Sequence, residues 1–128
     1  MSNEIKTITT QKAPPPFGHY VQATEAAGIV YVSGQLAPLP DGSSLANESF
    51  ETQARQALAN LIAIVEGAGL GRDRIAKVTV YVVGVEHWPT FNAIYAEVLG
   101  GHRPARAVVP VPALHHGYLI ELEAIAVR

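Results

Sequence analysis

The sequence of 128 residues contains no cysteine. This absence excludes a disulfide framework and a thiolate nucleophile, and it leaves the redox compartment of the protein undetermined. It also excludes the histidine and cysteine array of a zinc deaminase. Any catalytic group must therefore come from the other side chains.

Charge is also scarce, since charged residues make up 16% of the chain and 9 Lys and Arg stand against 11 Asp and Glu. The basic residues are scattered rather than clustered, so no strong positive field attracts a polyanion. A role centred on nucleic-acid binding is disfavoured, although a local basic patch stays open.

Long apolar runs are absent too. No segment approaches the roughly 18 uninterrupted apolar residues of a membrane span, and residues 1–16 contain no apolar core of a signal peptide. We expect no membrane association and a cytoplasmic location. The length predicts one domain over residues 1–128, and 48% apolar residues in so small a chain indicate that a homo-oligomer covers part of the surface.

The pattern of apolar residues along the chain predicts six strands and two helices. The expected strands cover residues 5–10, 20–23, 28–33, 75–83, 105–111 and 118–127, and the expected helices cover residues 50–68 and 86–99. Ser49 or Asn47 can cap the first helix, and three glycines in residues 67–71 can end it. This order predicts an α+β sandwich with both helices on one face of the sheet.

The last strand carries the most informative pattern. Alternation projects Glu121 and Glu123 from one face of an otherwise apolar strand, so a cationic partner is expected nearby. Arg106 is the best candidate, because a hairpin through residues 113–117 would place its strand beside the last one. Two interpretations stay open: a structural ion pair, or a site in which Arg106 binds a carboxylate and a glutamate activates water.

Two further side chains are candidates for the same pocket. Ser33 precedes a glycine at a strand end and can donate a hydrogen bond into the site, or it can serve only the turn. Tyr20 can place its phenol at the pocket lip, or it can fill the edge of the core. No metal is expected, since His115 and His116 are adjacent and would point to opposite faces of a strand, and the other histidines lack ligand spacing.

Five segments in order over almost the whole chain closely resemble the reactive-intermediate deaminase (Rid) family, also called the YjgF family. They are residues 18–22, 32–35, 53–60, 103–106 and 120–127. The resemblance implies a chorismate-mutase-like sandwich, with a mixed six-stranded sheet in each subunit of a homotrimer whose sheets form a central barrel. It also implies one active site at each subunit interface.

Carried over by resemblance, Arg106 binds the substrate carboxylate and Glu121 orients the attacking water. Tyr20, Ser33 and the backbone carbonyl of Val108 contact the substrate. The implied reaction is metal-independent hydrolysis of 2-aminoacrylate-type enamines and imines to 2-oxo acids and ammonia, with no cofactor.

The chain departs from the family pattern at three places: Val108 stands where cysteine is common, His19 where proline is common, and residues 112–118 lack the usual basic and proline-containing loop. These differences bear on the substrate. Two alternatives therefore stay beside the deaminase: a non-catalytic regulatory protein that binds a small metabolite, and an endoribonuclease or translation inhibitor. The near-neutral charge disfavours the second.

Overall fold

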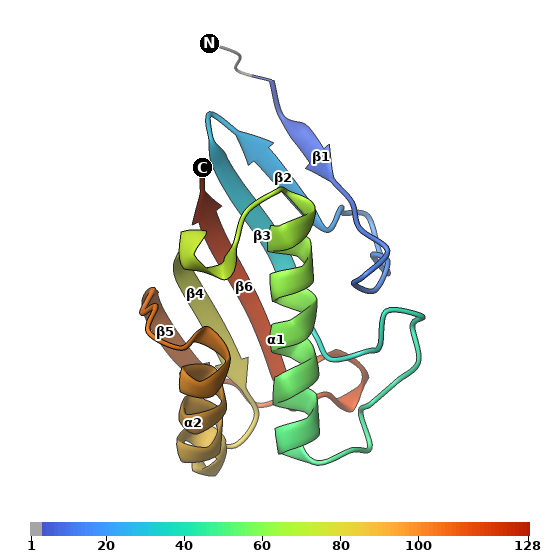
Figure 1. Cartoon of the computed structure of the whole chain (residues 1–128). Coiled ribbons are helices and arrows are strands. Elements are labelled where there is room, and N and C mark those ends of the chain that lie inside the picture. The colour runs from blue at the N-terminus through green and yellow to red at the C-terminus, as the bar shows by residue number, and fades with distance from the viewer. Residues whose placement is uncertain (1–3) are drawn as a thin grey trace.

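The computed structural model describes residues 4–128, which form one six-stranded sheet with two helices packed against it (Figure 1). The strands are β1 (Lys6–Ile8), β2 (Ala23–Ala26), β3 (Ile29–Gln35), β4 (Ile75–Val82), β5 (Ala105–Pro110) and β6 (Ile120–Val127). The predicted α+β class, with a mixed sheet of six strands, is therefore confirmed.

The order of strands across the sheet is β1-β2-β3-β6-β4-β5. All neighbours run antiparallel except β4 and β5, which are parallel because α2 (Trp88–Leu99) forms the crossover between them. The last strand thus lies in the middle of the sheet, between β3 and β4. It is buried on its α1 side and places its other side chains on the opposite face.

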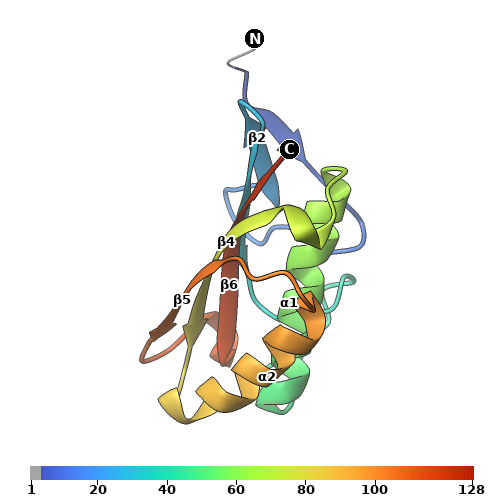
Figure 2. The same cartoon turned by 60° about the vertical axis from the view of Figure 1, so that its left-hand side comes forward.

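The helix α1 (Phe50–Gly67) begins where the sequence predicts. The Ser49 hydroxyl caps it by accepting a hydrogen bond from the Thr52 amide. Its apolar face packs on the sheet beside α2, and Figure 2 shows both helices on the same side of the strands. The alternating valines Val78, Val80 and Val82 of β4 complete that core.

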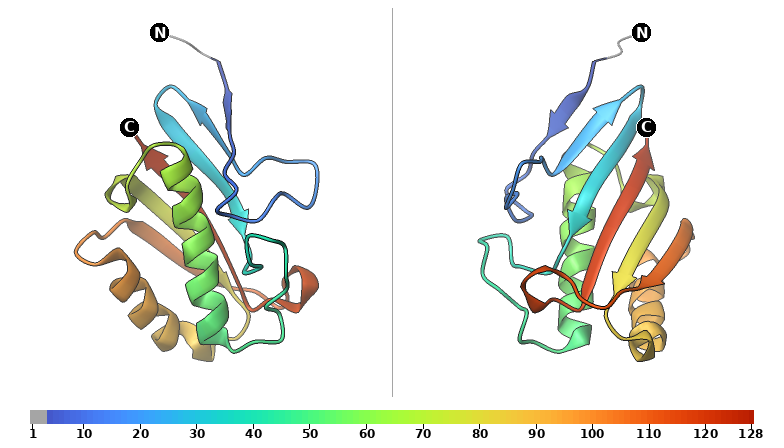
Figure 3. Two further views of the ribbon diagram at one scale, coloured as in Figure 1. Left: turned by 45° about the vertical axis from the view of Figure 1, so that its right-hand side comes forward. Right: turned by 180° about the vertical axis from the view of Figure 1, so that it is seen from behind.

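The opposite face of the sheet has no covering layer within the described residues, as the view from behind in Figure 3 shows. Large apolar side chains are exposed there, with Tyr31 of β3 at 45% and Val109 of β5 at 37% of their full exposure. Apolar surface of this kind is typical of a face that another protein surface covers.

Two predictions about the strands were wrong. The hairpin of β2 and β3 turns at Ala27 and Gly28, both with positive φ, so its first arm begins at Ala23 and not at Tyr20. More importantly, β5 does not pair with β6. The strand β4 separates them, because the crossover through α2 places β5 parallel to β4 at the edge of the sheet.

None of the helices formed within residues 4–128 has the length and apolar content needed to cross a membrane.

Candidate active site

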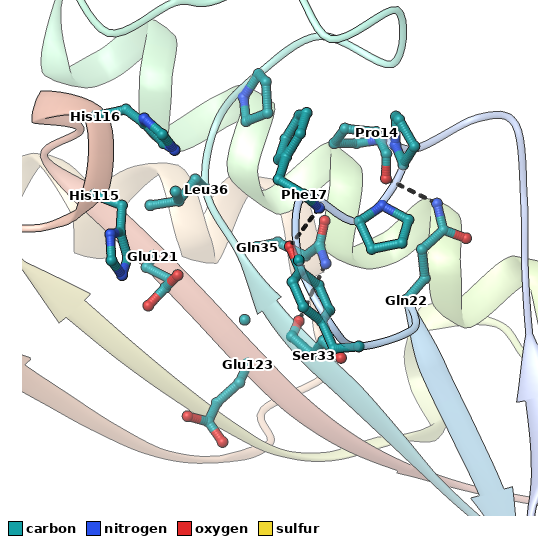
Figure 4. Close-up of a pocket in the computed structure, with 16 residues that line it drawn as sticks. Pro14, Phe17, Gln22, Ser33, Gln35, Leu36, His115, His116, Glu121 and Glu123 are labelled. Atoms are coloured by element: carbon teal, nitrogen blue, oxygen red, sulfur yellow. Dashed lines mark hydrogen bonds between the residues drawn. The ribbon is translucent and has the colours of Figure 1, made fainter.

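A cavity of about 580 Å³ opens on the sheet face away from the helices, where β3 ends and β6 begins (Figure 4). The loop of residues 14–20 forms one wall, and His115 and His116 form the opposite one. Glu121 and Glu123 of β6 and Ser33 to Gln35 of β3 form the floor. Segments far apart in the sequence therefore meet in one cavity because β3 and β6 are neighbours.

Glu121 lies half-buried in this cavity. Its carboxyl group packs so closely over Gly34 that a Cβ atom at that glycine would lie 3.1 Å from the carboxyl carbon. Burial raises the pKa of Glu121, the charge of His115 lowers it, and the neighbouring Glu123 raises it. A carboxylate in a cleft whose pKa is raised by burial is a candidate general base or acid.

Glu123 follows on the same face of β6, as the alternation predicts, but it is more exposed. It accepts a 2.9 Å hydrogen bond from the Tyr81 hydroxyl of β4, and this contact raises the pKa of the tyrosine. The two glutamates therefore differ in their surroundings. Glu123 has a neutral hydroxyl partner, whereas Glu121 faces the cavity.

Tyr20 and Ser33 both line the cavity, as the sequence predicts. Tyr20 is 47% exposed, and its hydroxyl accepts a 3.1 Å hydrogen bond from the Phe17 amide, so it lies at the lip rather than in the core. The Ser33 hydroxyl donates a 2.6 Å hydrogen bond to the Val21 carbonyl. Its proton is used in this hydrogen bond, so toward a ligand the Ser33 hydroxyl can act only as an acceptor.

Gln22 has a role that the sequence did not reveal. Its buried amide accepts a hydrogen bond from the Thr10 amide and donates to the carbonyls of Thr10, Ala13 and Pro14. The proline-rich wall of the cavity, which can form few bonds of its own because proline has no N–H, is fixed by this one side chain. In the sequence, a glutamine that closely follows consecutive prolines is the pattern that could have indicated this role of Gln22.

Arg106 and Val108 do not line this cavity. Both side chains of β5 point toward the helices, and the Arg106 guanidinium donates to Asn92 Oδ1 at 3.0 Å and lies 5.0 Å from the centre of the Tyr95 ring. The Tyr95 hydroxyl has no hydrogen-bond partner within residues 4–128, and burial raises its pKa to about 12. It therefore stays neutral beside the arginine.

The prediction that Arg106 is the cationic partner of Glu121 in the same chain was wrong. In the register of the sheet Arg106 aligns with Val78 and Ala124, which face the helices, whereas Glu121 aligns with Tyr81 on the opposite face. The two residues thus lie on different sides of the sheet with β4 between them. Within residues 4–128 no lysine or arginine lines the cavity.

The described residues contain no group of three or more His, Cys, Asp or Glu side chains arranged to hold a metal ion. His115 and His116, adjacent in a short turn, both line the cavity, with ring centres 6.1 Å apart. Proton transfer is the chemistry that this combination of carboxylates and imidazoles offers.

Comparison with known proteins shows which family the chain is similar to. A family profile described as Endoribonuclease L-PSP matches residues 10–128. The 2-iminobutanoate/2-iminopropanoate deaminase of Salmonella typhimurium is 43% identical over 126 residues, which cover 96% of this chain and 98% of that protein. The chain belongs to the Rid (YjgF, L-PSP) family.

Solved structures of the Rid family share the fold of this member over nearly its whole length. The Escherichia coli YjgF gene product is 41% identical, with a TM-score of 0.90, and the alignment covers 96% of this chain and 98% of that one. Escherichia coli TdcF, with bound serine, is 37% identical, with a TM-score of 0.91 and the same coverage. A small polar molecule thus binds to one Rid protein of this fold.

Proposed function

We propose that this Rid protein hydrolyses reactive 2-imino acids, the tautomers of 2-aminoacrylate-type enamines, to 2-oxo acids and ammonia. The reaction takes place between copies of the chain in a homotrimer. Relatives named as imine deaminases at about 40% identity support the activity. The observation that carries the proposal is the half-buried Glu121, held over Gly34 in an open cavity with a raised pKa.

The predicted site residues lie in two separate places within one chain, and this arrangement supports a homotrimer. Tyr20, Ser33 and Glu121 lie together in the cavity, whereas Arg106 and Val108 lie on the edge strand β5. A 2-imino acid carries a carboxylate, and the cavity offers no arginine or lysine from the described part of its own chain. The edge strand of a second copy, laid against the open sheet face, would bring Arg106 to the cavity and cover exposed apolar side chains.

In the proposed homotrimer, each site residue has a distinct role in the hydrolysis. Arg106 of the second copy holds the substrate carboxylate through paired hydrogen bonds, with the Val108 carbonyl and the Ser33 oxygen as neutral acceptors and the Tyr20 phenol at the lip. Glu121 orients a water molecule and takes its proton as the oxygen attacks the imine carbon. Glu121 passes this proton to nitrogen, which gives a carbinolamine. The hydroxyl proton of the carbinolamine then also moves to nitrogen through Glu121, and ammonia leaves as the C–N bond breaks and the C=O bond forms.

The test is release of ammonia and 2-oxo acid from 2-aminoacrylate and 2-aminocrotonate, generated in place by a dehydratase. Wild type is expected to accelerate release. Arg106→Ala is expected to lower kcat/KM at least about a hundredfold, and Glu121→Gln to lower kcat by about the same factor, because each removes a group that acts on the substrate or the water.

Glu66→Ala, at an exposed position of α1 on the helix side of the sheet, serves as the control and is expected to keep wild-type activity. Acceleration that persists in both site variants would contradict the assignment of residues. A folded protein that binds a 2-oxo acid but gives no acceleration would favour the metabolite-binding alternative over catalysis.

A further inference from the structure

His115 occupies the wall of the cavity directly beside Glu121. It belongs to the short turn His115–Gly117 that precedes β6, so the turn and the strand position both side chains together. In Figure 4 the imidazole ring of His115 lies next to the Glu121 carboxylate, and both face the open cavity.

We propose that His115 is a further positioning residue of this site: its imidazolium pairs electrostatically with the Glu121 carboxylate and keeps that carboxylate in the proton-accepting form. This inference rests on the proposed hydrolysis. In that reaction a water proton moves to Glu121 while the water oxygen bonds to the imine carbon and the C=N electron pair moves to nitrogen. The step needs Glu121 to be ionised.

Apart from the two histidines, the side chains of residues 4–128 that line the cavity beside Glu121 offer it no positive charge. Glu123 lies on the same face of β6 and is itself an acid that raises the pKa of Glu121. Tyr81, opposite in β4, donates a hydrogen bond to Glu123, and the Tyr20 hydroxyl at the lip accepts one from the Phe17 amide. His115 is the charge that lowers the pKa of Glu121 against the effect of burial.

Two further basic side chains, His116 and Arg106 of a second copy, bear on the environment of Glu121. His116 lines the same cavity, but in Figure 4 its ring lies farther from Glu121, toward Leu36. Arg106 of a second copy adds positive charge in the proposed trimer. Because arginine stays protonated at every working pH, its effect does not change with pH, whereas an imidazole loses its charge near neutrality.

The experiment uses the whole protein and reads the Glu121 carboxyl directly, by a ¹³C NMR pH titration assigned with the Glu121→Gln variant. Replacement of His115 by Asn removes the cation, so the pKa of Glu121 is expected to rise and its titration midpoint to move to higher pH than in wild type. His115→Gln, a second uncharged replacement, is expected to move it in the same direction.

His116→Asn is the matched control. His116 has a φ of 61°, in the left-handed region that asparagine tolerates well, so the turn is preserved. The Glu121 midpoint is expected to move less in this variant than in His115→Asn. No movement in the His115 variants, or equal movement in all three, would overturn the proposal.

The expected rise in the pKa of Glu121 also predicts a change in the pH dependence of catalysis. Protonated Glu121 cannot accept a proton, so the acid limb of the kcat/KM profile is expected to move to higher pH in His115→Asn. The ratio of kcat/KM near pH 5.5 to that near pH 8 should fall about threefold or more, since one pKa unit corresponds to a tenfold change in populations. A wild type without imine hydrolysis would refute the proposed function, while the NMR titration would still decide the His115 pairing.

Discussion

At the scale of single residues, the proposed chemistry depends on how closely Glu121 is held. The carboxylate could move freely on an exposed strand, but here Gly34 allows it to lie flat on the neighbouring strand. Its Oε2 atom would be 3.2 Å from a Cβ atom at that position. The backbone of Gly34 does not adopt a positive φ, so the absence of a side chain, and not backbone freedom, is what this glycine contributes.

Gly34→Ala is therefore expected to lower kcat/KM for imine hydrolysis about tenfold, because the new methyl group displaces the carboxyl by a few tenths of an ångström. The free energy of unfolding should change by less than about 1 kcal/mol. Steady-state kinetics and urea denaturation measure the two effects. Gly101→Ala is the control, since nothing lies within 4 Å of a Cβ atom there; equal rates in both variants would argue against a requirement for the position of Glu121.

At the scale of elements, the cavity is built from loops that a few buried amides attach to the sheet and the helix. Gln22 fixes the loop before β2, and Asn60 of α1 donates to the carbonyls of Leu36 and Pro38 after β3. Gln53 of α1 donates to the Ala46 carbonyl and accepts from the Leu119 amide just before β6. Such buried amides replace the ladder hydrogen bonds that irregular backbone lacks.

Gln22→Leu is expected to cost about 2 to 3 kcal/mol of unfolding free energy, because it leaves buried backbone groups of residues 10–14 without partners. The loosened wall should also raise KM more than it lowers kcat. Urea denaturation and steady-state kinetics measure the two changes. Gln11→Leu, at an exposed position of the same loop, is expected to stay within about 0.5 kcal/mol, and similar losses in both variants would disprove the role of Gln22.

At the scale of the whole molecule, the two halves of the predicted site lie on opposite faces of one sheet. A β-strand alternates its side chains between two faces, so no change of rotamer brings Arg106 through the sheet to Glu121. In the proposed homotrimer, Arg106 of a second copy would take the place that Arg106 of the same chain cannot reach. The exposed Tyr31 and Val109 lie on the open face that such a copy would cover.

Mixed assemblies test this arrangement. Arg106→Ala and Glu121→Gln chains, each nearly inactive alone, are expected to recover activity when they are co-expressed and assemble together. With random mixing of equal amounts, about a quarter of the interfaces pair an intact arginine with an intact glutamate, so about a quarter of wild-type activity should return. Mass spectrometry verifies the mixing; verified mixed trimers without recovery would show that both residues must belong to one chain.

Much of the architecture followed from local patterns. The 3.6-residue period and the Ser49 cap defined α1 to within a residue. The period reflects burial of one helix face, whichever element covers it, and the cap marks where the helix begins. The alternation of β6 placed Glu121 and Glu123 on one face for the same kind of reason. The family segments identified the fold and the candidate residues.

The sequence by itself therefore determined the number and type of the main elements, the shared face of Glu121 and Glu123 on β6, and the family, whereas the start of β2 was misplaced. Only the tertiary structure decided the order of strands: a crossover through α2 and a simple hairpin both satisfy the same local periods, and the choice between them places β4 between β5 and β6. That choice separates Arg106 from Glu121. Neighbours across a sheet depend on how the whole core packs, which no local pattern specifies.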